Sequence, residues 1–119
     1  MKMKTMALVL ALFSAAYVFA FAAPPVYPGA KAIAELNDAA KKAGRDDLSY
    51  NTLDSFEKVF EFYNSKGSEN EKAHRVTPKT KSAMIMFKDS GYAVFISWRE
   101  EDSKSKGTVI HIGKGGGAR

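Results

Sequence analysis

From Ser82 onward the sequence changes to a period of two and reads as consecutive strands. The three runs are SAMIMFK, YAVFISWR and TVIHI, at residues 82–88, 92–99 and 108–112. Asp89-Ser90-Gly91 separates the first two runs as a turn, and a longer polar turn at residues 100–107 separates the last two. Successive side chains of a strand point to opposite faces, and strands joined by short turns pair antiparallel. We therefore expect a three-stranded antiparallel meander.

The predicted sheet carries large apolar side chains on both faces. The middle run divides them into two sets: Tyr92, Val94, Ile96 and Trp98 on one face, and Ala93, Phe95 and Ser97 on the other. A three-residue turn would align the first set with Met84 and Met86. A two-residue turn would align it with Ile85 and Phe87, because a slip of one residue exchanges faces. In both registers we expect either one helix on each face or a second face that is left for a partner.

Two helices are predicted before the sheet. The first covers residues 30–43, where Ala and Lys predominate and Ile33 and Leu36 form a narrow apolar stripe. Gly44 follows this helix in the position of a C-cap glycine. A short extended segment with alternating side chains is expected at residues 48–52.

The second predicted helix runs from Asp54 to Gly67. Asp54 is expected to cap it, with Glu57 returning the hydrogen bond as in a capping box. One set of its residues recurs at the spacing of a single buried stripe: Phe56, Val59, Phe60 and Tyr63. We interpret this stripe as core, and Phe62 as a ring that lies off it. Residues 68–81 are then expected to form a polar loop that could include a short extended piece around Val76.

The first 22 residues have the pattern of a secretory signal peptide. Lys2 and Lys4 precede the uncharged run from Met6 to Ala22, and Ala20-Phe21-Ala22 fits a small-x-small cleavage site. The alternative is an uncleaved membrane anchor, but the run is at the lower limit of length for crossing a bilayer. We therefore expect residues 1–22 to be removed by cleavage after Ala22.

Cleavage would leave one domain and a tail. Residues 23–112 suffice for a single α+β domain of two helices followed by the three-stranded antiparallel meander. Residues 113–119, GKGGGAR, are expected to form a disordered tail. The formal net charge falls from +5 to +3 when Lys2 and Lys4 are removed. The chain has no Cys, so its apolar core must stabilise it without disulfides.

The residue types that most catalytic and metal sites need are missing or dispersed. The chain has no Cys and only two histidines, His74 in a predicted loop and His111 in a predicted strand. This argues against a Cys/His nucleophile and against a zinc site. The composition does not exclude a Ser/His/Asp triad, but the sequence contains no Gly-x-Ser-x-Gly motif that would position its serine. We expect no catalytic residue, no metal and no cofactor.

Two short motifs carry a resemblance. Tyr27-Pro28-Gly29-Ala30 stands near the expected mature start, and Thr52-x-Asp54-Ser55-Phe56-Glu57-Lys58-Val59-x-x-Phe62-Tyr63 leads into the second helix. In both, the chain resembles a loose group of small exported bacterial proteins and lipoproteins. The resemblance implies an envelope location and a compact α+β fold, and it carries over no functional residue. The lipid-anchoring Cys of the lipoprotein members is missing from this chain.

The leading hypothesis is a small, exported, non-enzymatic binding or interaction domain of the bacterial envelope, in the periplasm or outside the cell. Because Trp and Arg are enriched at binding hot spots, the candidate interaction surface is placed around one pair: Trp98 and Arg99, with Tyr92, Phe95 and Phe62. A core role for Trp98 is the competing interpretation. The expected partner is another envelope protein or a second copy of the chain, not nucleic acid, and a membrane only if the N-terminal segment is retained. The alternatives are a small periplasmic hydrolase or lyase with an unrecognised site, and a membrane-anchored accessory subunit.

Overall fold

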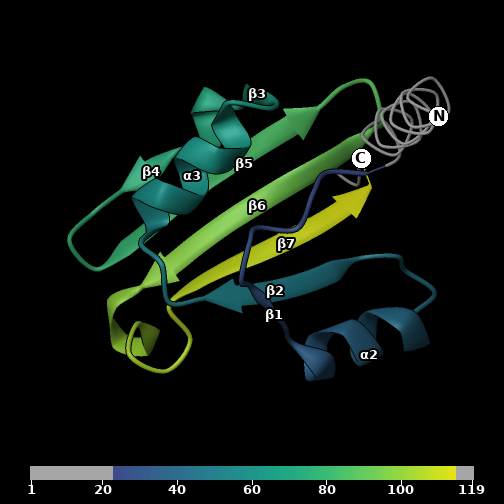
Figure 1. Ribbon diagram of the computed structural model, residues 1–119, viewed down its shortest axis with the longest axis horizontal. Helices are drawn as coiled ribbons and strands as arrows, with labels where there is room; N and C mark the ends of the chain where they lie inside the picture. The colour runs from purple at the N-terminus through teal and green to yellow at the C-terminus, as the bar shows by residue number, and fades with distance from the viewer. Residues whose placement is uncertain (1–22, 115–119) are drawn as a thin grey trace, which may run out of the picture.

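The computed structural model describes residues 23–114, shown in colour in Figure 1. The predicted signal peptide lies outside the described residues, as do residues 115–119 of the predicted tail. The described part of the chain forms one antiparallel sheet, with one helix on a face of the sheet and another helix at its edge (Figure 1).

The sheet has seven strands within residues 23–114. In chain order they are β1 (Lys31–Ala32), β2 (Leu48–Thr52), β3 (Ser68–Glu69), β4 (Arg75–Val76), β5 (Thr80–Phe87), β6 (Tyr92–Arg99) and β7 (Thr108–Lys114). The order across the sheet is β1-β2-β7-β6-β5-β3, and β4 also pairs with β5. All of these pairs are antiparallel.

The predicted fold of two helices and a three-stranded meander is therefore wrong. β5, β6 and β7 do form a meander, but β2 pairs with β7 along its whole length, and short strands extend both edges. Strands of two residues are too short to show a period of two in the sequence. The pairing of β2 with β7 joins segments that are distant in the chain, and no local pattern encodes such a pairing.

The register between β5 and β6 decides which side chains share a face. Phe87 pairs with Tyr92, so the turn contains residues 88–91, and Gly91 adopts a φ of +75°. Neither of the two predicted turn lengths is observed. The side chains are nevertheless divided between the two faces as the two-residue turn would divide them. Ile85 and Phe87 share a face with Tyr92, Val94, Ile96 and Trp98.

One face of the sheet holds the hydrophobic core beneath α3 (Phe56–Asn64), as Figure 1 shows. The buried apolar residues of the sheet are Ala83, Ile85, Val94, Ile96, Ile110 and Ile112. The predicted stripe of α3 is confirmed for Phe56, Val59 and Tyr63, which are at most 3% exposed. Phe60 is only partly buried and packs against the edge of this core.

Residues 23–30 cross the same face as α3. Tyr27 is buried in the core, and the hydroxyl of Tyr63 donates to the carbonyl oxygen of Pro25 at 2.7 Å. The N-terminal segment therefore completes the cover that α3 begins. We refer to this side of the sheet as the covered face.

The N-terminal cap of α3 differs from the prediction. Ser55, not Asp54, is the N-cap residue, and its Oγ accepts a hydrogen bond from the backbone N–H of Lys58 at 3.2 Å. The Asp54 carboxylate instead accepts a hydrogen bond from the hydroxyl of Tyr27, with an O···O distance of 2.6 Å. This bond ties the start of the described chain to the start of α3.

The other helix, α2 (Ala34–Lys42), lies beyond β2 alongside the sheet (Figure 1). It begins later than predicted because Lys31 and Ala32 pair with β2 as strand β1. The side chain of Asn37 fixes α2 to the edge of the sheet: its Oδ1 accepts from the Ser49 backbone N–H at 2.6 Å, and its Nδ2 donates to the Ser49 carbonyl. α2 therefore occupies an edge and does not cover the second face.

Two predicted irregular segments contain regular structure. The predicted loop at residues 68–81 includes β3, a 3-10 turn at Glu71–Ala73, β4 and the start of β5; β4 is the short extended piece expected around Val76. β7 continues to Lys114, so Gly113 and Lys114 belong to a strand and not to the predicted tail. Both corrections arise because neighbouring strands supply the hydrogen bonds.

Candidate functional site: the open face of the sheet

Over β5, β6 and β7 the second face of the sheet is covered by neither α2 nor α3, the two helices of residues 23–114, whereas at β2 its Ser49 is buried beside α2. We call this second face the open face. From the strand register its side chains are Thr80, Ser82, Met84 and Met86 of β5, Ala93, Phe95, Ser97 and Arg99 of β6, Val109, His111 and Gly113 of β7, Ser49 and Asn51 of β2, and, on the short edge strands, Lys31, Ser68 and Arg75. Along β5, β6 and β7, at residues 82–86, 93–97 and 108–112, buried residues of the covered face alternate with partly exposed residues of the open face.

One row of side chains crosses the middle of the open face. It runs from Met84 through Phe95 and His111 to Ser49, which are directly paired across four strands. The rings of Phe95 and His111 are nearly parallel, at 28°, with centroids 6.4 Å apart. The Oγ of Ser49 lies 2.6 Å from Nδ1 of His111. This row therefore combines an apolar half with one oriented imidazole.

The surroundings of His111 favour its neutral form. Burial of the ring lowers the pKa of His111 from its ordinary value, and the carboxylate of Asp47 opposes this only in part. Asp47 packs over Gly113, where an added Cβ would come within 2.8 Å of Oδ1. With His111 neutral, the middle row is uncharged, but the register places three cations on the same face toward one end: Arg99 of β6, Arg75 opposite Ser82, and Lys31 opposite Asn51.

The cluster of Ser49, His111 and Asp47 contains the residue types of a hydrolytic triad but not its arrangement. Ser49 is 4% exposed, and its backbone N–H and carbonyl are both held by Asn37. A nucleophilic hydroxyl must reach the substrate, and the Ser49 hydroxyl faces Nδ1 of His111 inside the protein. The pair can orient the imidazole ring, but it does not present a nucleophile.

The structure does not bring the predicted site residues together. Trp98 and Tyr92 lie on the covered face and pack partly buried against the core. Each is approached by a lysine ammonium: Lys81 lies 4.8 Å from the Trp98 ring centroid, and Lys114 lies 5.7 Å from that of Tyr92. These contacts favour the core interpretation of Trp98.

Phe62 lies away from the sheet faces, on α3, and Arg99 lies at the end of β6. Phe62 packs edge-on to Tyr27, with centroids 5.2 Å apart, and the Lys66 ammonium sits 4.1 Å above its ring. Arg99 is exposed, with Nε 3.7 Å from a carboxylate oxygen of Glu101. Among the predicted residues, Phe95 and, at the end of β6, Arg99 belong to the open face. The methionines, Val109 and His111 could have been placed beside Phe95 from the alternation alone once the register was known.

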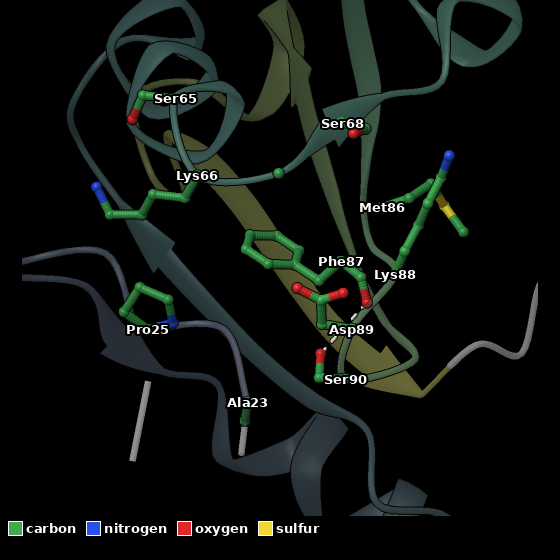
Figure 2. Close-up of a pocket in the computed structure, with 11 residues that line it drawn as sticks. Ala23, Pro25, Ser65, Lys66, Ser68, Met86, Phe87, Lys88, Asp89 and Ser90 are labelled. Carbon is green, nitrogen blue, oxygen red and sulfur yellow. Dashed lines mark hydrogen bonds between the residues drawn. The ribbon is translucent and has the colours of Figure 1, made fainter. Parts of the chain in front are cut away.

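A cavity of about 990 Å³ lies between the C-terminal end of α3 and the β5–β6 turn (Figure 2). The ring of Phe87 lies above Asp89 and Ser90, and the Ser90 Oγ donates to the Phe87 carbonyl at 3.3 Å. In Figure 2 the side chains of Met86 and Lys88 point away from this ring. The cavity therefore offers an aromatic wall and one carboxylate, but no converging set of polar groups.

A smaller cleft of about 460 Å³ lies beside the bond between Tyr27 and Asp54. That hydrogen bond is the main cause of a raised pKa at Tyr27. Within residues 23–114 no group of three or more His, Asp or Glu side chains is placed to hold a metal ion. His74 contacts Glu69 and packs against the Phe60 ring, on the side of the sheet opposite to His111.

No family model, curated protein or solved structure matches this chain. The resemblance to small exported bacterial proteins therefore stays a prediction. Among residues 23–114, neither helix has the length and apolar character needed to cross a membrane.

Proposed function

We propose that this chain is a small, exported, non-enzymatic binding domain that docks a protein partner on the open face of its sheet. The observation that supports the proposal is the asymmetry of the sheet. Both faces carry apolar side chains, and only one is packed beneath α3 and residues 23–30. A sheet with two apolar faces is normally covered on both, because domains are built from packed layers.

The exposed apolar surface gives such a partner a source of binding energy. Met84, Met86, Phe95 and Val109 are contiguous across β5, β6 and β7, and all are partly exposed. Each Å² of apolar area removed from water contributes about 25 cal/mol. Contiguous exposed apolar surface on a small protein commonly marks an interaction site. Methionine side chains adapt easily to the shape of a partner, which suits this role.

A binding role also agrees with the chemistry of the other candidate sites. Ser49 is inaccessible as a nucleophile, and the cavity beside Phe87 lacks converging polar groups. The proposal therefore assigns no catalytic residue and no cofactor. Its location in the periplasm or outside the cell rests on the signal-peptide pattern of residues 1–22.

Charge substitution on the open face tests the proposal. Phe95→Asp should abolish partner recovery by crosslinking in envelope extract, because it places an unpaired charge in the contact. The matched control is Leu53→Asp, since Leu53 is 76% exposed and lies outside the open face. Both variants should keep the wild-type melting curve. Recovery of the same partners by Phe95→Asp as by the wild-type chain would contradict the proposal.

A further inference from the structure

We infer that the partner is a second copy of this chain, packed open face to open face. This inference rests on the proposed function and names its partner. The dimer would contain two sheets in its centre and one α3 on each outer side. Stacked sheets of this kind pack about 10 Å apart and within about 30° of parallel, because both sheets twist.

The charges on the open face determine how a second copy can pack there. The chain carries a formal net charge of +5, or +3 without Lys2 and Lys4, so two copies repel each other over most of their surfaces. On the open face the middle row is uncharged when His111 is neutral, and the cations Arg99, Arg75 and Lys31 all lie toward one end. Two positive copies can therefore meet there without opposing like charges only if their cationic ends lie apart.

The charges at the rim also suit a twofold arrangement. Arg99 ends β6 at one end of the open face, and Asp47 lies over Gly113 at the other end. A twofold axis that runs across the strands would place the Arg99 end of one copy over the Asp47 end of the other. Phe95 and His111, in the middle row, would then lie near the axis and close to their own counterparts.

The area is sufficient for a reversible dimer. β5 and β6 are each eight residues long, which corresponds to about 26 Å at roughly 3.3 Å per residue. Four strands spaced about 4.8 Å apart span about 19 Å, so each copy offers about 500 Å². The total of about 1,000 Å² is at the lower end of specific interfaces, which predicts a dimer that dissociates on dilution.

Pairing through the edges of the sheet is the competing route to self-association, and the described residues obstruct it. On one side β1 offers two residues, and Asn37 occupies the backbone groups of Ser49. On the other side β3 and β4 pair with the outer edge of β5. Short or covered edge strands are a common protection against edge pairing.

The two methionines of the open face allow a direct test. They are the only ones that remain when residues 1–22 are removed. Sedimentation of the mature chain should show a mass that doubles with concentration, and peroxide oxidation of Met84 and Met86 should slow several-fold over the same range. Phe95→Asp should be monomeric at every concentration and oxidise rapidly, whereas Leu53→Asp should behave as the wild type. Ser97→Arg also adds a charge to the open face. It is the test variant to use if Phe95→Asp melts at a lower temperature than the wild type.

The outcomes separate this inference from the proposed function. A chain that is monomeric throughout, with methionines equally reactive at all concentrations, overturns the second-copy inference. A crosslinked envelope protein that depends on Phe95 would still support the proposed function in that case. Methionine protection that requires added phospholipid vesicles overturns both, because the occupant would be a membrane. A dimer that survives both charge variants also overturns the inference.

Discussion

The Oγ of Ser49 lies 2.6 Å from Nδ1 of His111, across the pairing between β2 and β7. Ser49 is in turn held by Asn37 of α2, so one chain of contacts joins the edge helix to the middle of the open face. The orientation of the imidazole is therefore fixed by three elements that are separate in the sequence.

We expect the stability of the fold to decrease in mildly acidic solution because of His111. Burial lowers the pKa of His111 in the folded chain, with Asp47 opposing it. In the unfolded chain the pKa of this histidine is about 6.5. Between that pH and the lower pKa of the folded chain, the unfolded chain binds more protons, so the free energy of unfolding falls as the pH falls through this range. Urea denaturation at several pH values measures this slope. His111→Asn keeps an acceptor for Ser49 and should flatten the slope; an unchanged slope would assign it to another group.

The two aromatic rings on the same side of α3 should differ in their contribution to stability. Phe56 is 3% exposed, and Phe56→Ala should lower the free energy of unfolding by about 3–5 kcal/mol. Phe60 is only partly buried, between Phe56 and His74, so Phe60→Ala should lower it by less than about 3 kcal/mol. Chemical denaturation of both variants decides the order. Equal losses would mean that Phe60 is as deeply packed as Phe56.

Trp98 and Phe95 lie on opposite faces of β6 and should respond differently to truncation. Trp98 packs against the core, so Trp98→Ala should destabilise the fold by about 2 kcal/mol or more. Phe95 faces outward in the isolated chain, so Phe95→Ala should change stability by less than about 1 kcal/mol at low protein concentration. Melting curves in dilute solution provide the comparison. Unfolding by both variants would show that the open face is packed within the single chain.

Gly107 and Gly91 form a matched pair of turn glycines. Both have positive φ, +64° and +75°, so alanine is strained by about 1–2 kcal/mol at either position. At Gly107 a Cβ would also lie 2.2 Å from the Thr52 carbonyl oxygen, whereas at Gly91 nothing lies within 4 Å. Gly107→Ala should therefore be clearly more destabilising than Gly91→Ala. Similar losses in urea denaturation would mean that the contact relaxes without cost.

The native protein should begin at Ala23. This follows from the Lys-flanked apolar run and the Ala20-Phe21-Ala22 site. N-terminal sequencing of protein isolated from its source checks the cleavage directly. An intact Met1 in a membrane fraction would favour the anchor interpretation instead.

The sequence alone determined the elements whose signals are local. The period of two marked β5, β6 and β7, and the spacing of Phe56, Val59 and Tyr63 marked the buried side of α3. These patterns are readable because burial acts on every second residue of a strand and on every third or fourth residue of a helix.

Only the tertiary structure decided how those elements are arranged. The β5–β6 turn has four residues, and its length settled that Phe95 faces away from the core with the methionines while Trp98 faces toward it. Both faces of β6 are apolar, so the pattern could not distinguish them, and a one-residue slip would have exchanged them. β2 pairs with β7, although the two strands are far apart in the sequence. This pairing places Ser49 beside His111 and α2 at an edge of the sheet. The open face results from the placement of α2 at an edge. Hydrogen bonds between distant strands, and not local propensity, determined where α2 could pack.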